Sequence, residues 1–278
     1  MAVPESRGRL ARRELLRAGL ALIAAGALPA RAAAQARGAS SSPLPEFRKL
    51  VAANRILANE GVVDAFSHVS VRDPRNAERF WLSRSRSPAL VELDDLMEFS
   101  LDGAAIDARG RTPYGERMIH AAVYAARPDV HSVVHNHSYG VLPFTITDEP
   151  LRPVVHTASV IGAVVPVWDI RTRFGGTDML VRSIEQGRDF AATLADNTCA
   201  LIRGHGAVVV GASIERAVLT AIYLQVNAGV LLQALQLGGE PEALSAEEIE
   251  RSSETQFSPL ALDRSWEYFC QRAGVDPG

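Results

Sequence analysis

The sequence has 278 residues, of which 47% are hydrophobic and 22% are charged, an ordinary composition for a globular protein. Its formal net charge is -3 at pH 7, so no basic surface field is expected to attract nucleic acid or an anionic membrane. Its two cysteines, Cys199 and Cys270, stand far apart without C-x-x-C spacing, which favours unpaired thiols. We therefore expect one folded core and a small-molecule ligand.

Residues 1–36 have the pattern of an export signal. A basic region that includes Arg12 and Arg13 is followed by an apolar run at 18–29 and by small residues at 32–36. The arginine pair resembles the twin-arginine signals that carry folded, often cofactor-loaded proteins out of the bacterial cytoplasm. The apolar run is shorter than the ~20 residues that span a bilayer, so no stable membrane anchoring is expected. We expect a periplasmic mature protein, or a cytoplasmic one if this segment is not a signal.

The folded part is expected to begin near Glu46. Residues 37–45 are small, polar and proline-containing, which predicts a linker into a domain that spans 46–278. Apolar side chains then recur at helical spacing, and Gly61 stands where a helix would stop, so a first helix is predicted over 47–60.

Helical and strand patterns alternate along the rest of the chain. Short apolar runs bounded by turns predict strands, and apolar residues at a 3.6-residue period predict helices. The predicted strands are 69–71, 79–82, 132–137, 163–168, 199–203 and 207–210, and the predicted helices are 114–126, 184–194 and 214–237. The polar segment beyond Gly238 is expected to end in a short aromatic helix at 266–269. This alternation, without an internal repeat, predicts an α/β layered domain.

Three histidines form the most informative pattern. His135 and His137 lie two residues apart on a predicted strand, so their side chains point the same way. His205 stands between Gly204 and Gly206, where the backbone can turn tightly. Three neutral imidazoles suit one divalent ion of zinc, manganese, iron or cobalt and leave positions open for substrate. The alternative is a pair of hydrogen-bonded histidines beside a turn.

Glu116 is the expected carboxylate partner of this metal. It opens a predicted helix that leads through Pro128 directly into the histidine strand, so a helix-to-strand connection can return it to the metal. We interpret Glu116 as an acid/base and weak ligand, although a glutamate at a helix start is also a common partner of the helix dipole.

Several motifs carry a family resemblance. They are EGVVD at 60–64, YGERMIH at 114–120, AARPDV at 125–130, VVHNHS at 133–138 and RGHGA at 203–207. In this order they resemble the class II aldolase/adducin family over residues 47–237. The resemblance implies a three-layer α/β/α catalytic domain around a central, mostly antiparallel sheet, and a homotetramer with sites at subunit interfaces. It also implies that His135, His137 and His205 bind the metal and that Glu116 is the acid/base.

The sequence departs from the sugar-phosphate aldolases of this family at their phosphate loops. Those enzymes use an asparagine-serine loop and a serine pair before the glutamate, whereas this chain has SHVS at 67–70 and Tyr114-Gly115. No phosphate pocket is therefore expected. The loop SRSRSP at 83–88 instead offers arginines that can bind a planar carboxylate, unless they are merely solvated. Its predicted substrate contacts are Arg84, Ser85 and Arg86.

Three features resemble the decarboxylase branch of the family, namely His68, the loop at 83–88 and the segment 143–156. This branch acts on hydroxylated aromatic or pyridine carboxylic acids, so the resemblance implies a divalent-metal-dependent lyase for such a substrate. A metal chelated by the aromatic hydroxyl can take up the electrons that remain when carbon dioxide leaves. A general acid must then protonate the ring carbon.

Specific roles follow from this expected chemistry. Glu116 is the first candidate for the general acid and His68 is the second. Tyr114 and His156 are predicted substrate contacts. A single histidine without a motif partner is more often a hydrogen-bonded structural residue, and this interpretation is favoured for both His120 and His156.

Other functions compete with decarboxylation. An aldolase that cleaves a hydroxy-keto sugar or acid needs the same metal-stabilised enolate, and the sequence does not separate the two reactions. A cupin-like barrel also carries H-x-H, but there a glutamate follows shortly, whereas Tyr139-Gly140-Val141 follows here. A non-catalytic adducin-like scaffold would not need the complete set of three histidines and Glu116.

Overall fold

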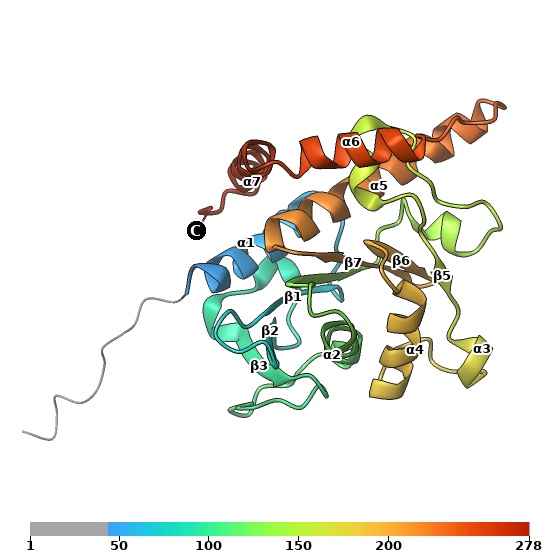
Figure 1. The fold of residues 1–278 in the computed structure, drawn as a ribbon. Helices are drawn as coiled ribbons and strands as arrows, with labels where there is room; N and C mark the ends of the chain where they lie inside the picture. Colours follow the sequence, from blue (N-terminus) through green and yellow to red (C-terminus); the bar gives the residue numbers. More distant parts are fainter. Residues whose placement is uncertain (1–43, 278) are drawn as a thin grey trace, which may run out of the picture. The chain divides into compact units, whose positions relative to one another are not determined.

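The computed structural model describes residues 44–277 (Figure 1). The predicted export signal at 1–36 and residues 37–43 of the predicted linker lie outside the described residues. The first helix, α1 (Pro45–Asn59), begins at the last residue of that linker, because Pro45 has the fixed backbone angle that suits the first turn of a helix.

A seven-stranded sheet lies at the centre, with the strand order β3-β2-β1-β4-β7-β6-β5. The strands are β1 (His68–Arg72), β2 (Arg79–Ser83), β3 (Leu96–Ser100), β4 (Ser132–Asn136), β5 (Val167–Trp168), β6 (Cys199–Ile202) and β7 (Gly206–Gly211). Neighbouring strands are antiparallel except for β5 and β6, which are parallel. The predicted α/β class with a mostly antiparallel sheet is confirmed.

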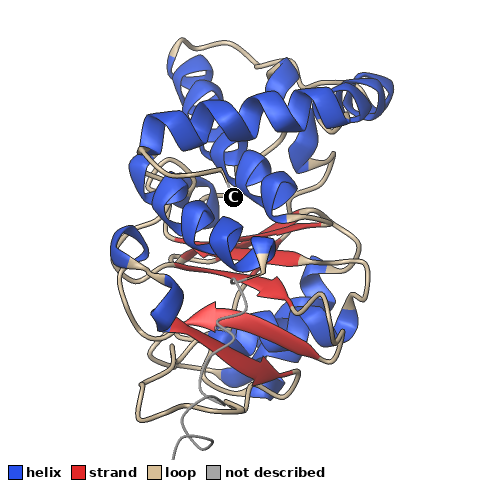
Figure 2. Cartoon of the chain, turned by 90° about the vertical axis from the view of Figure 1, so that its left-hand side faces the viewer, coloured by secondary structure: helices blue, strands red, loops and turns tan. Residues whose placement is uncertain are grey.

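Helices cover both faces of the sheet (Figures 1 and 2). Besides α1, they are α2 (Arg117–Ala126), α3 (Arg171–Phe174), α4 (Ile184–Leu194), α5 (Ile214–Gln236), α6 (Ala246–Gln256) and α7 (Pro259–Ala273). Short 3-10 helices lie in the loops, as η1 (Pro88–Leu90), η2 (Leu93–Asp95), η3 (Leu142–Thr145) and η4 (His156–Ile161). Side chains alternate across each strand, so Val134 of β4 belongs to the core cluster that includes residues of α1, α5 and α7, whereas Val133 belongs to the cluster that includes residues of α2 and α4.

Helix α5 is the central helix of one layer. By length and composition it could cross a membrane, but half of its apolar stretch is buried inside the fold. A helix that is apolar nearly all round is expected where neighbouring elements surround it. This burial agrees with α5 being a core helix.

Most predicted elements lie where the periodicity placed them, and three predictions need correction. The predicted strand 163–168 contains only two strand residues, because Pro166 has no N–H to donate to a neighbouring strand. The helix expected at 114–126 begins at Arg117, with Glu116 as its N-cap. The short helix expected at 266–269 is part of the longer α7.

The segment after Gly238 is also more ordered than predicted. Ser245 accepts a hydrogen bond from the backbone N–H of Glu248 and forms a capping box that starts α6. Ser258 caps α7, which has Pro259 in its first turn. These helix-start signals are present in the sequence, and polar composition alone was a poor guide to the segment.

Candidate metal centre

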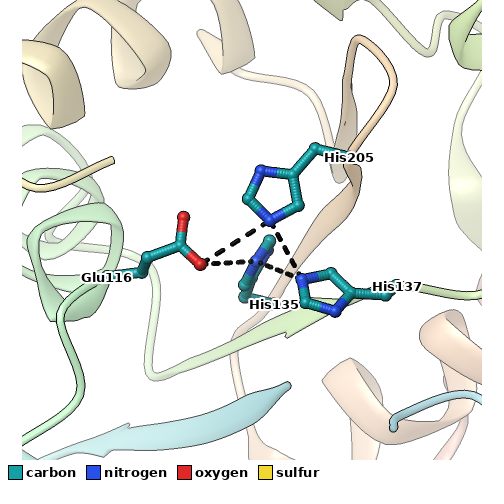
Figure 3. Close-up of side chains that lie close together, drawn as sticks. All are labelled: Glu116, His135, His137 and His205. Carbon is teal, nitrogen blue, oxygen red and sulfur yellow. Dashed lines mark hydrogen bonds and ion pairs between the residues drawn. The ribbon is translucent and has the colours of Figure 1, made fainter. Parts of the chain in front are cut away.

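The three histidines of the predicted metal site meet at one end of β4 and β7. Strand β4 contains His135 and ends one residue before His137. Because Asn136 pairs with Ala207 of β7, the turn before β7 brings His205 to the same place. The Nε2 atom of His137 lies 3.2 Å from that of His135 and 3.0 Å from that of His205 (Figure 3).

The opposite nitrogen of each imidazole is bound to an oxygen. These hydrogen bonds run from His135 Nδ1 to Ala207 O (3.2 Å), from His137 Nδ1 to Asp64 Oδ2 (3.0 Å) and from His205 Nδ1 to Met179 O (3.0 Å). Carbonyl and carboxylate oxygens only accept, so each neutral ring carries its proton on Nδ1 and a lone pair on Nε2. Three lone pairs directed at one point repel each other unless a cation lies between them. The donor set therefore fits one divalent metal ion.

Glu116 completes the cluster from the N-cap of α2. Its Oε2 lies 3.5 Å from His135 Nε2 and 3.6 Å from His205 Nε2, and its Oε1 accepts the backbone N–H of Val181 at 3.0 Å. The ligand atoms of the four side chains all lie within 4.8 Å of one another. Burial opposes the ionisation of Glu116, but its interactions with His135 and His205, which favour the carboxylate when Nε2 of these rings carries a proton, prevail and lower its pKa to about 2. Glu116 is thus an anionic carboxylate beside the histidines.

A pocket of about 420 Å³ opens beside the cluster, a volume that suits a small ligand. Its lining residues are Ala65, Phe66, His68, Ser85, Arg86, Ser87, Tyr114, Gly115, Glu116, His137, Leu180 and Arg182. The hydroxyl of Tyr114 donates to the backbone oxygen of Arg86 and so ties the loop after β2 to the start of α2. The metal cluster and the predicted substrate loop therefore share one cavity.

The structure brings four of the six further predicted site residues to this pocket. They are His68, Ser85, Arg86 and Tyr114. Arg84 does not line it. Its Nε is bound to Asp95 Oδ1 at 2.6 Å, and Arg86, which does line the pocket, binds the other oxygen of that carboxylate at 2.6 Å. His156 lies at the start of η4, exposed to solvent and 3.3 Å from the side-chain nitrogen of Gln256 on α6.

His68 is held in the pocket wall by a chain of buried hydrogen bonds. Its Nδ1 lies 2.7 Å from His120 Nε2, and His120 Nδ1 lies 2.5 Å from Ser70 Oγ, which also contacts the Tyr124 hydroxyl at 2.8 Å. Burial, with the nearby histidines, lowers the pKa of His68 well below its ordinary value, and burial lowers that of His120 to about 3. Both rings are neutral. The interpretation of His120 as a hydrogen-bonded structural residue is confirmed.

Sequence reasoning missed two residues of the site. Asp64 holds His137 from a position 73 residues earlier in the chain, although it lies within the EGVVD motif at 60–64. Arg182 lines the pocket from the loop before α4, and no motif marks it.

Comparison with known proteins identifies the family. The model of the class II aldolase and adducin N-terminal domain matches residues 48–232. That range contains the complete sheet, the three histidines and Glu116. The chain belongs to the class II aldolase and adducin family.

Curated relatives include decarboxylases. The chain is 36% identical over 203 residues to decarboxylase tropJ of Talaromyces stipitatus, which covers 68% of this chain and 76% of that protein. It is 31% identical over 216 residues to the 3,4-dihydroxyphthalate decarboxylase of Arthrobacter keyseri. The aligned residues cover 73% of this chain and 85% of that protein. Among solved structures, an L-fuculose 1-phosphate aldolase from Glaciozyma antarctica matches with a TM-score of 0.65 and 24% identity, over 82% of this chain and 90% of that one. This last likeness shows the shared fold.

Proposed function

We propose that the chain is a divalent-metal-dependent lyase that decarboxylates a hydroxylated aromatic or heteroaromatic carboxylic acid. The observation that carries the proposal is a cluster of three histidines and a glutamate that opens into a pocket lined by Arg86 and Tyr114. The two relatives above support it, because both are named decarboxylases and one acts on a dihydroxylated aromatic acid.

His135, His137 and His205 would hold one ion of zinc, manganese, iron or cobalt, with Glu116 as acid/base and weak ligand. When bound, the ion supplies a Lewis acid that stabilises the negative charge developing on the substrate. The Nδ1 hydrogen bond of each histidine fixes its ring orientation before any ion arrives.

The remaining pocket residues bind and orient the substrate. Leu180 and Phe66 offer apolar surface to a flat ring, and Arg86 offers hydrogen bonds to a carboxylate. When carbon dioxide leaves, the broken bond leaves an electron pair on the ring carbon, which must take up a proton. Glu116 and His68 both line the pocket and are the proposed sources of that proton. Glu116, an anion in the free pocket, would first take up the proton that the ring hydroxyl loses on binding and then pass it to the ring carbon.

Aldol cleavage of a hydroxy-keto sugar or acid is the second candidate, because it needs the same metal-stabilised enolate that the histidine and glutamate cluster could serve. Phosphate binding at the usual loop is not supported, because both the N–H and the Oγ of Ser67 bind Asp64 Oδ1, at 2.9 and 2.8 Å. A non-catalytic adducin-like scaffold would have no use for the intact cluster of histidines and Glu116.

The family resemblance also leads us to propose a homotetramer. Phe66 at the pocket and Tyr139, two residues after His137, are large apolar side chains with 72% and 78% of their surface exposed. A partner subunit that covers them would bury apolar area, which favours association.

The test is carbon dioxide release from a panel of hydroxylated benzene and pyridine carboxylates. The protein is supplied with zinc, manganese, iron or cobalt. We expect release that stops with a chelator and with Glu116→Gln, whereas His156→Gln, outside the pocket, retains it. Absence of release from every acid, with metal bound, would contradict the proposal and favour aldol cleavage.

A further inference from the structure

Arg182 gives the pocket a second cation besides Arg86. Within the lining residues, Glu116 is the one acidic side chain, and it belongs to the metal cluster. The part of the pocket away from the histidines therefore presents two guanidinium groups. Arg86 binds Asp95 Oδ2 through Nη1 at 2.6 Å, and Arg182 binds Asp178 Oδ2 through Nε at 2.7 Å. Neither aspartate lines the pocket, and each guanidinium keeps further N–H groups for a ligand. Such a surface is complementary to an anionic group of a ligand.

The loop that carries Arg182 is fixed to the metal cluster. The residue before it, Val181, donates its backbone N–H to Glu116 Oε1 at 3.0 Å, and Met179 O accepts from His205 Nδ1 at 3.0 Å. Met179 has a left-handed φ of 66°, a conformation that non-glycine residues seldom adopt and that often accompanies a functional constraint. The position of Arg182 is thus set by the same contacts that set the acid/base and one histidine.

Tyr114 and Gly115 lie between the two arginines. The Tyr114 hydroxyl donates to the backbone oxygen of Arg86, and a Cβ at Gly115 would lie 3.3 Å from Arg182 Nη1. Glycine therefore lets the guanidinium approach the backbone just before Glu116. Asp178 Oδ2 accepts the Nε–H of Arg182 at 2.7 Å, which orients the side chain, and no described residue accepts a hydrogen bond from its Nη groups.

The chemistry of decarboxylation decides which group the arginines bind. A guanidinium pair stabilises a carboxylate anion far more than neutral carbon dioxide. Arginines around the departing carboxylate would therefore stabilise the ground state and slow its loss. The same pair around a carboxylate that stays on the product anchors the substrate throughout the reaction.

We propose that Arg182, together with Arg86, binds a second acidic group that the substrate retains, so that the substrate class is a hydroxylated aromatic diacid. This inference rests on the proposed function and makes Arg182 a specificity-determining residue. The leaving carboxylate and the ring hydroxyl then face the metal cluster, and the retained acid faces the arginines.

Calorimetric titration of the manganese-loaded protein with two probes tests this inference without turnover. Catechol and 3,4-dihydroxybenzoate share a chelating pair of hydroxyls and differ by one carboxylate. We expect wild type to bind the benzoate about tenfold more tightly than catechol. Arg182→Gln should weaken benzoate binding by about tenfold and leave catechol binding within about twofold.

Arg173→Gln is the matched control. Its side chain is 54% exposed, against 58% for Arg182, but it pairs with Glu185 and Asp189 and does not line the pocket. It should change neither affinity. Equal weakening of both probes by Arg182→Gln would show a merely structural role and overturn the inference.

Two other outcomes separate the inference from the proposed function. Selective loss of benzoate binding in Arg182→Gln, with no carbon dioxide release from any acid, supports the anion subsite and contradicts decarboxylation. Release of carbon dioxide by a wild type that binds catechol and the benzoate equally supports decarboxylation and overturns the subsite.

Discussion

His120 of α2 holds the pocket wall in place from a fully buried position that faces β1. Its ring joins His68 Nδ1 to Ser70 Oγ. His120→Leu introduces an apolar side chain of similar size but leaves His68 Nδ1 without its hydrogen-bond partner and Ser70 Oγ with the Tyr124 hydroxyl alone. We expect a loss of about 2–4 kcal/mol in the free energy of unfolding, measured by urea denaturation.

The comparison for this prediction is His156→Leu. His156 is exposed on η4, and a surface substitution of this kind should change stability by no more than about 0.5 kcal/mol. Equal stabilities of the two variants would mean that the hydrogen bonds linking His68, His120, Ser70 and Tyr124 contribute nothing to the free energy of unfolding.

The residues that sequence reasoning identified differ physically from those it missed. His135 and His137 were predicted together because alternation along one strand gives their side chains a common direction. His205 stands between two glycines, so the sequence itself indicates the turn that carries it. Asp64 and Arg182 reach the site by tertiary contacts, from loops whose positions no periodicity specifies.

At the scale of elements, the close packing of α2 against α4 positions Glu116 at the N-cap of α2. A Cβ at Gly187 of α4 would lie 2.4 Å from Met118 O and 3.0 Å from Ala122 Cβ, both in α2. Gly187→Ala must therefore push the two helices apart. We expect it to lower the free energy of unfolding by about 1–3 kcal/mol, measured by chemical denaturation.

Gly229 in α5 is the matched glycine, because a Cβ there meets nothing within 4 Å. Gly229→Ala should stabilise the protein by about 0.5–1 kcal/mol through higher helix propensity. A Gly187→Ala variant as stable as Gly229→Ala would contradict close contact between α2 and α4.

Secondary structure was predictable where one face of an element is buried. The strands around the site and helices α4 and α5 show their period clearly, and their bounds agree within one residue. The edge strand β3 was missed, although the Asp102-Gly103 turn follows its sequence LMEFS. Helix α6 was missed because it has no fully buried residue, so no apolar stripe marks it.

At the scale of the whole molecule, the family fold and the export segment are two separate features. We propose export through the twin-arginine route, based on Arg12-Arg13 and the apolar run at 18–29. Residues 1–38 fused to a reporter should carry it to the periplasm, and the same fusion with Arg12→Lys and Arg13→Lys should not. A reporter that stays in the cytoplasm with the native segment would refute export.

The fold class and the metal cluster were accessible from sequence for one shared reason. Motifs from five separate stretches lie on β4, on α2 and in loops that the fold brings together, with β4 between β1 and β7 in the sheet. The shape of the pocket was not accessible, because it depends on where residues 85–87 and 180–182 of two loops lie relative to the metal cluster.

Metal content is the most direct test of the site, since every proposed role depends on a cation at the histidines. His137 is the most exposed of the three, with 17% of its side-chain surface accessible, so its removal should disturb folding least. Elemental analysis of purified protein should find about one divalent ion per chain in wild type and in His156→Ala, and little in a folded His137→Ala. Undiminished metal in His137→Ala would contradict the assignment of this centre.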